Sequence, residues 1–350
     1  MAVCPSPSHP VATVGPVQPA VVTRRTVVDL DFEPDLVTVR HAIDGTVVGD
    51  RAGRELRWAT VTPVGIGSLH LRRSDARRVE VTAFGAGADW LVEQTPLLLG
   101  AADDVEGLRR DLLPPQLARR PVPRIGRTDR VVESMVPAVL GQKVQATLAN
   151  RSLRLLAARF GDAAPGPGEL RATPSAARFA DLAVHDLHRC GVERKRGDTI
   201  RRAARLAFRL EEAAGLGPEV LEARLRAVPG IGPWTSALVR LGATGDPDAV
   251  EVGDFHLPNT VCWALAGEER GDDRRMLELL EPFRGHRGRV VRMISALGLR
   301  APRRGPRLEP LPVDRYDGPD RDAVWFRDRG PGGGGWRDRP LDAAARSRSR

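Results

Sequence analysis

The spacing of apolar residues changes once along this chain, and that change limits which folds it can adopt. Between residues 26 and 83, apolar and polar residues alternate in short runs that are typical of β-strands. From residue 128 to residue 299, apolar residues recur every three or four positions, as on one face of a helix. The pattern predicts a mainly α chain with an α+β N-terminal domain.

Individual elements follow from the same pattern. Four runs predict the strands of a small antiparallel sheet, at 26–32, 55–62, 68–72 and 79–83. Helical patterns fall at 34–43 and 88–99. After a connector rich in Pro and Arg, Thr128 and Asp129 are suited to cap the first long helix of an all-helical half.

These elements divide the chain into four parts. Residues 1–24 hold five prolines and little periodicity, which predicts a disordered leader. Residues 25–112 form the predicted antiparallel-sheet domain and residues 113–300 the predicted helical domain. Residues 301–350 are rich in Arg, Gly and Pro, which predicts a disordered tail.

Composition excludes several classes of protein. No stretch approaches the roughly 18 apolar residues that a membrane span needs, and the N-terminus lacks the apolar core of an export signal. Three cysteines are too few for a disulfide framework, so we expect a cytoplasmic protein without membrane partners. The net charge of +9 favours a polyanionic partner.

The run Val-Pro-Gly-Ile-Gly-Pro-Trp-Thr at 228–235 lies between two helical patterns. Gly230 and Gly232 permit a tight turn that approaches a surface closely, and Pro233 suits the first position of a helix. Amides at such a helix start form an anion site that fits a DNA phosphate. The alternative is a structural turn between two helices, closed by a glycine.

Three separated motifs resemble the helix-hairpin-helix DNA glycosylases, and among them the alkylation-repair branch, 3-methyladenine DNA glycosylase II. The motifs are Val-Leu-Gly-Gln-Lys-Val at 139–144, the hairpin run and a lone acid at Asp254. The resemblance covers residues 110–300 well and residues 26–100 only in layout. It implies a helix-hairpin-helix glycosylase domain joined to a small antiparallel-sheet domain.

The resemblance also implies a set of site residues, each carried over by its motif. The implied roles are catalysis by Asp254, a base pocket of Trp234, Phe255 and His286, and DNA binding by Gly230, Ile231, Gly232, Thr235, Gln142, Lys143 and Arg287.

The loop 245–259 offers four carboxylates, Asp246, Asp248, Glu251 and Asp254. Asp254 lies 22 residues after Gly232 and directly before an aromatic residue, which agrees with the family pattern for the catalytic acid. A fixed carboxylate there stabilises the oxocarbenium character that builds on the sugar, and it can orient the attacking water. The alternative is that Asp254 caps the following helix, and both roles can coexist.

Relatives that also cut the DNA strand use a lysine amine at the position of Trp234, so the resemblance implies monofunctional hydrolysis. The indole face would attract a cationic alkylated purine, although Trp234 is also suited to packing the hairpin against its neighbours.

Two positions depart from the branch. Lys143 replaces an apolar or amide side chain beside the residue that wedges into DNA, so intercalation and phosphate contact are equally expected. His286 replaces a second pocket tryptophan, which puts the substrate range in doubt, or it is only a polar residue at a helix start. The basic run at 194–196 either tracks the DNA backbone or forms a solvated helix face.

Cys4, Cys190 and Cys262 are too scattered for an iron-sulfur cluster, and no metal-ligand spacing is present. The resemblance implies only a monovalent cation at the hairpin.

From the resemblance we expect a monomeric, nucleoid-associated DNA glycosylase that acts on double-stranded DNA with alkylated purines in base-excision repair. The alternatives are a glycosylase for another lesion, such as a deaminated base, and a non-catalytic binder of damaged DNA.

Overall fold

The computed structural model describes residues 22–36, 47–50 and 52–302. Most of the predicted tail, most of the predicted leader and most of the predicted helix at 34–43 lie outside these residues. Everything described below belongs to one compact unit of the chain. The division into four parts remains a prediction.

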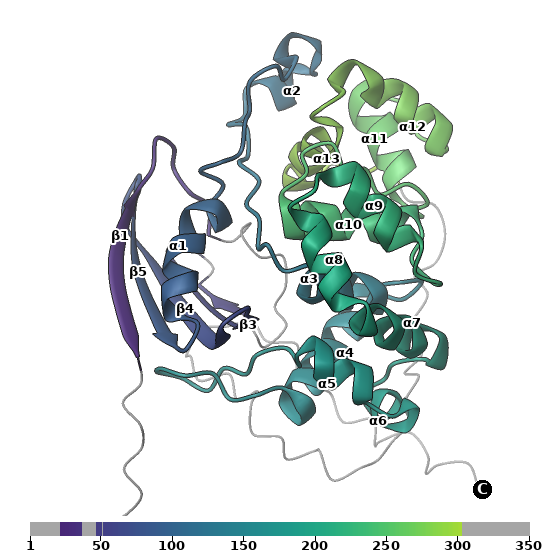
Figure 1. Ribbon diagram of the computed structural model, residues 1–350. Helices are drawn as coiled ribbons and strands as arrows, with labels where there is room; N and C mark the ends of the chain where they lie inside the picture. Colours follow the sequence, from purple (N-terminus) through teal and green to yellow (C-terminus); the bar gives the residue numbers. More distant parts are fainter. Residues whose placement is uncertain (1–21, 37–46, 51, 303–350) are drawn as a thin grey trace, which may run out of the picture. The chain divides into compact units, whose positions relative to one another are not determined.

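The first described elements form a five-stranded antiparallel sheet with the order β1-β5-β4-β3-β2 (Figure 1). Its strands are β1 (Thr23–Asp29), β2 (Val47–Gly49), β3 (Glu55–Thr62), β4 (Gly65–Asp75) and β5 (Arg78–Gly85). The four predicted strands are all present, whereas β2, with three residues, carries too little pattern to be predicted. Strand β1 begins within the predicted leader.

Helix α1 (Ala88–Leu98) lies against the sheet. Alternation places Val79, Val81 and Ala83 of β5 on the buried face, where they share a core with Trp58 and Leu91. Two short elements follow: η1 (Arg110–Leu112), at the end of the predicted sheet domain, and α2 (Pro115–Ala118), in the connector rich in Pro and Arg, for which no element was predicted.

The remaining elements are helical. They are α3 (Val131–Leu140), α4 (Ala146–Phe160), α5 (Ala176–Asp181), α6 (Val184–Arg189), α7 (Arg194–Arg205), α8 (Ala207–Ala214), α9 (Pro218–Arg226), α10 (Pro233–Thr244), α11 (Leu257–Ala266), α12 (Asp273–Leu280), η2 (Glu281–Phe283) and α13 (Arg287–Ala296). Helices α3 to α10 share one core, and α11 to α13 share a second with α2. The loop between α10 and α11 joins these two cores.

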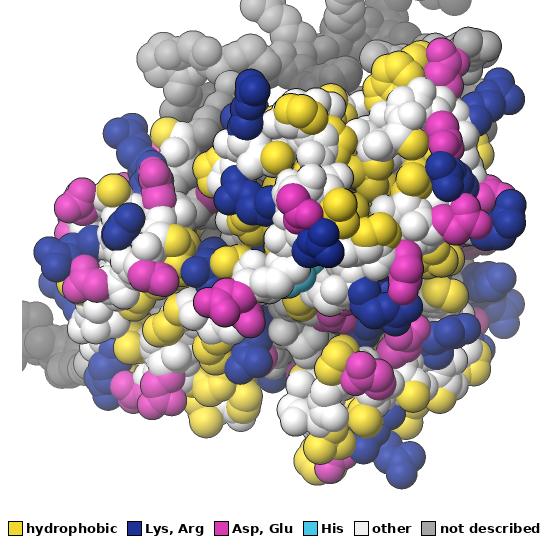
Figure 2. All heavy atoms as spheres, turned by 90° about the horizontal axis from the view of Figure 1, so that it is seen from above, with side chains coloured by type: hydrophobic (Ala, Val, Ile, Leu, Met, Phe, Trp, Pro, Cys, Tyr) yellow, Lys and Arg dark blue, Asp and Glu magenta, His cyan; other side chains and the backbone are white. Residues whose placement is uncertain are grey.

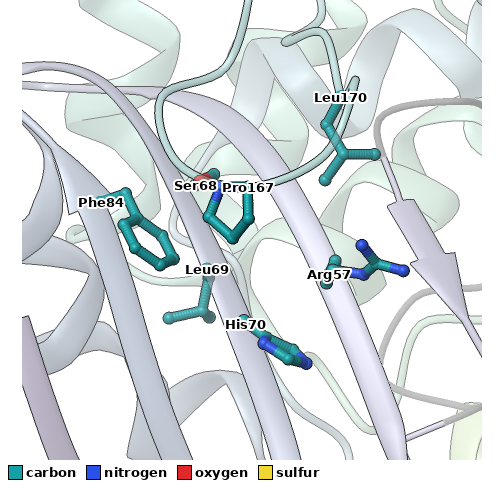
Figure 3. A pocket seen from close by; sticks show the side chains of 7 residues that line it. All are labelled: Arg57, Ser68, Leu69, His70, Phe84, Pro167 and Leu170. Atoms are coloured by element: carbon teal, nitrogen blue, oxygen red, sulfur yellow. The ribbon is translucent and has the colours of Figure 1, made fainter. Parts of the chain in front are cut away.

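Beyond α1, the sheet contacts helix α3 and the loop 163–171. Trp58 donates from Nε1 to Glu133 of α3 at 2.9 Å, and Thr60 bonds the same carboxylate. The loop 163–171 reaches the sheet, where Ser68 donates to the Pro165 carbonyl. A small hollow lies at this contact, lined by residues such as Leu69, Phe84 and Pro167 (Figure 3). None of its lining residues belongs to the predicted site.

Candidate active site

The hairpin between α9 and α10 uses its two glycines differently. Gly230 has φ +102°, and a Cβ added there would lie 2.1 Å from Thr199 Oγ1. Gly232 has an extended backbone with φ −99°, and an added Cβ would meet no atom within 4 Å. Gly230 is therefore required by the fold, whereas Gly232 leaves an open surface that a ligand can approach closely.

Two side chains of the hairpin run are buried. Ile231 is 5% exposed and belongs to the core of α3 to α10, and Thr235 is also buried. Gln142 donates from Nε2 to the Gly230 carbonyl and to Thr235 Oγ1, both at 2.9 Å. The turn 141–143 is thus bonded to the hairpin through Gln142.

The same turn borders Trp234. A Cβ added to Gly141 would lie 3.3 Å from Trp234 Cη2, so the backbone of the turn passes close to the indole. Lys143 is exposed and has a left-handed backbone with φ +56°, which is uncommon for a residue with a side chain. Its amine is therefore carried on a constrained turn beside the hairpin.

Asp254 lies on the other side of the indole. Trp234 donates from Nε1 to Asp254 Oδ2 at 3.0 Å. Asp254 Oδ1 accepts the backbone amides of His256 and Leu257 at 2.8 and 2.9 Å, at the start of α11. The carboxylate therefore bonds the first amides of α11, as the capping alternative expects, and it also contacts the predicted pocket indole; its catalytic role remains a prediction.

The three other candidate acids of the loop are paired with arginines. Asp246 bonds Arg240 at 2.6 Å, Asp248 forms a bidentate pair with Arg287, and Glu251 pairs with Arg292. The bonds that hold Asp254 come from neutral N–H groups instead. Asp254 is thus the one of the four candidates, all within the described residues, whose negative charge is not offset by an arginine bonded to it.

The pKa values of two of these paired acids are shifted in opposite directions, although burial acts in the same direction on both. Burial raises the pKa of Asp246 above its ordinary value, although Arg240 opposes this shift. Burial would also raise the pKa of Asp248, but bonds from the Arg287 side chain and from the amides of Arg287 and Gly285 outweigh it and lower that pKa. Asp248 is therefore held as an ionised structural group.

The residue before Asp254 is held by an acid that sequence reasoning missed. Gly253 has φ +92°, and its amide donates to both carboxylate oxygens of Asp273 at 3.1 and 3.2 Å. Asp272 caps α12, which leaves the neighbouring Asp273 available for this contact. The adjacent pair of aspartates at a helix start was the available signal.

His286 and Arg287 have partners other than the indole and Asp254. His286 is 9% exposed; its Nδ1 accepts from Arg289 Nε at 3.2 Å, so Nε2 carries the hydrogen donated to the Glu106 carbonyl. Arg287 is bound to Asp248. Their implied roles in the pocket and on DNA remain predictions, and these contacts give both residues a structural role.

Phe255 is 87% exposed, with the His256 ring edge-on at a centroid distance of 4.8 Å. It projects into solvent beside Asp254.

The surface charges are mixed: on the face in Figure 2, Lys and Arg side chains are interspersed with Asp and Glu. The excess of arginine is thus not gathered into one basic patch on that face.

Within the described ranges, Cys190 and Cys262 are free and buried, and no group of His, Cys, Asp and Glu is arranged to hold a metal ion. No helix there is long and apolar enough to cross a membrane.

Known proteins resemble this chain in sequence and in structure. No protein-family model matches it. The chain is 33% identical over 145 residues to the probable bifunctional transcriptional activator/DNA repair enzyme AlkA of Mycobacterium tuberculosis, a match that spans 40% of this chain and 29% of that protein. The chain thus matches under a third of the length of its curated relative.

Among the solved structures that match over 78% of this chain are two DNA glycosylases with different lesions in their names. The 3-methyladenine DNA glycosylase of Archaeoglobus fulgidus has a TM-score of 0.67 at 19% identity and is covered over 97% of its length. The 8-oxoguanine glycosylase/lyase of Clostridium acetobutylicum, in complex with DNA, has a TM-score of 0.59 at 11% identity and is covered over 98%. These matches confirm the expected fold class, a mainly helical chain with an N-terminal antiparallel sheet.

Proposed function

We propose, from the helix-hairpin-helix DNA glycosylase fold of this chain, that it hydrolyses the N-glycosidic bond of alkylated purines in double-stranded DNA. One observation carries the proposal: the Asp254 carboxylate is bonded to Trp234 beside the glycine hairpin and is not paired with an arginine. The sequence match to a probable DNA repair enzyme supports the same reading.

In this mechanism, hairpin amides around Gly232 bind a backbone phosphate, and the target nucleotide is extruded from the duplex. As the bond from C1′ to the base nitrogen breaks, its electron pair leaves with the base and positive charge builds on the sugar. Asp254 Oδ2 stabilises that charge. Water then bonds to C1′ and releases a proton, which the Asp254 carboxylate accepts.

The substrate class follows from the surroundings of the carboxylate. The Trp234 face attracts a cationic purine, by about 2 kcal/mol when water is excluded. An alkylated purine is already a good leaving group, so one carboxylate suffices.

Monofunctional hydrolysis is part of the proposal, because the position bonded to Asp254 holds an indole rather than an amine. The proposed function also includes action as a monomer on damaged double-stranded DNA. The structural match to an 8-oxoguanine glycosylase/lyase keeps a different lesion as the second candidate.

The test is release of 3-methyladenine and 7-methylguanine from methylated duplex DNA under single-turnover conditions. Asp254→Asn should be about a thousandfold slower, because the charge is lost while Oδ1 still caps α11. Glu251→Gln is the control for loss of a loop carboxylate. DNA binding without release from any damaged duplex would favour a binder, and strand cleavage without alkali would contradict monofunctional action.

A further inference from the structure

Arg196 of α7 is buried under the turn 141–143. It is 5% exposed, and its Nη1 donates to the carbonyl of Leu140, the last residue of α3, at 2.7 Å. The sequence placed this arginine in a basic run that either follows DNA or faces solvent. The structure instead directs its guanidinium to the backbone immediately before Gly141.

Helix α3 is held by complementary charges at both ends. At its start, Glu211 accepts the amides of Val131 and Val132 at 2.8 and 3.1 Å. At its end, the Arg196 guanidinium lies where the helix dipole favours a cation. The Arg196 contact therefore holds the end of α3, where the turn that carries Gln142 and Lys143 begins.

The same face of α7 supports the hairpin. Thr199, one helical turn after Arg196, donates to the Lys195 carbonyl and lies 3.4 Å from the Pro229 carbonyl oxygen. It also fills the space in front of Gly230. Helix α7 thus contacts both turns of the candidate site, and Gln142 bonds the turns to each other.

We infer that Arg196 is a positioning residue that sets the turn 141–143 against the hairpin, so that Gln142 and Lys143 meet the DNA strand next to the extruded nucleotide. This inference rests on the proposed function. It assigns the buried arginine a role in aligning DNA contacts without touching DNA itself.

The chain offers a matched control in Arg171. Its guanidinium also donates to carbonyls at a helix end, those of Ala157 and Gly161 at the end of α4. That helix end adjoins the loop that packs on the sheet rather than the hairpin. Arg171→Met therefore removes the same kind of bond at a site unrelated to the predicted DNA contacts.

The experiment compares Arg196→Met, Arg196→Lys and Arg171→Met by thermal unfolding, single-turnover base release and amide hydrogen exchange. We expect both Met variants to lower the melting temperature, but only Arg196→Met to slow base release tenfold or more and to speed exchange of the amides at 141–145. Arg196→Lys should recover part of the rate, because its ammonium can reach the same carbonyl.

A rate for Arg196→Met within twofold of Arg171→Met, or unchanged exchange at 141–145, would overturn the inference. Loss of rate that is additive with Gln142→Ala would also count against it, because both residues are inferred to hold one turn. If the wild type releases no base, the proposed function fails, and the exchange measurement still decides whether Arg196 holds the turn.

Discussion

The loop 245–254 and the hairpin 228–232 both support the residues around Trp234, but they are held by opposite means. Arginines from α10 and α13 pair with three loop acids, Asp246, Asp248 and Glu251. The hairpin contacts described above are neutral: the buried Ile231, the close approach of Thr199 to Gly230, and the amide of Gln142.

The difference predicts two kinds of sensitivity. A backbone held by ion pairs depends on the charge of each partner, and so on pH. A backbone held by close packing depends on volume, where a single added methyl group is enough to disturb it. Substitutions in the two regions should therefore fail in different ways.

Gly230→Ala should have the largest effect. The added Cβ would lie 2.1 Å from Thr199 Oγ1 in a left-handed backbone, so we expect the free energy of unfolding to fall by about 3 kcal/mol. Urea denaturation measures this change. A midpoint equal to the wild-type value would show that the hairpin is not held by packing.

Asp248→Asn tests the charged region, with an expected loss of about 2 kcal/mol at pH 7. The pKa of Asp248 is lowered in the folded state, so its stabilisation is complete above the ordinary value of 3.8 and is lost as pH falls through the folded-state pKa. Urea denaturation as a function of pH should show the wild type and the variant converging in acid. A constant difference down to pH 2 would argue against an ionic contribution.

Trp234→Phe keeps an aromatic face and removes the Nε1 donor to Asp254. We expect base release to slow about tenfold, equivalent to about 1.4 kcal/mol, with little change in stability. Single-turnover kinetics beside a melting curve separate the two. An unchanged rate would show that the indole N–H does not orient the carboxylate during the reaction.

Gly232→Ala should have the smallest effect and provides the sharpest contrast with Gly230. No atom lies within 4 Å of the added Cβ, so we expect unchanged stability but DNA affinity weaker by about 1 kcal/mol, because the methyl group keeps a phosphate away. Fluorescence anisotropy with an abasic-site duplex measures it. Equal affinity would mean that the phosphate lies elsewhere.

Local patterns predicted much of the fold. Alternation located β3 at its observed bounds, and helical spacing located α1 to within one residue. Capping was harder to predict: Thr128 and Asp129 were expected at the start of α3, but its first amides are bound by Glu211 from α8. A partner about 80 residues away leaves no local signal.

The candidate site shows the same limit. The motif spacing predicted Trp234 and Asp254 as site residues, and in the structure the two side chains are joined by a hydrogen bond. The partners of His286 and Arg287, at Glu106 and Asp248, were not predicted, since tertiary packing alone brings these segments together. Arg196 resembled its exposed neighbours in sequence, and only the packing of α7 against α3 distinguishes it.

The three N–H groups around Asp254 have a consequence for the energetics of the proposed base release. They immobilise the carboxylate in the protein without DNA, with Oδ1 bonded twice and Oδ2 directed by the indole. A preorganised charge needs little reorientation as the sugar becomes cationic, so the reorganisation energy of the environment is small. The hydrogen bonds at the start of α11 therefore also hold the negative charge of Asp254 in a fixed orientation before a substrate binds.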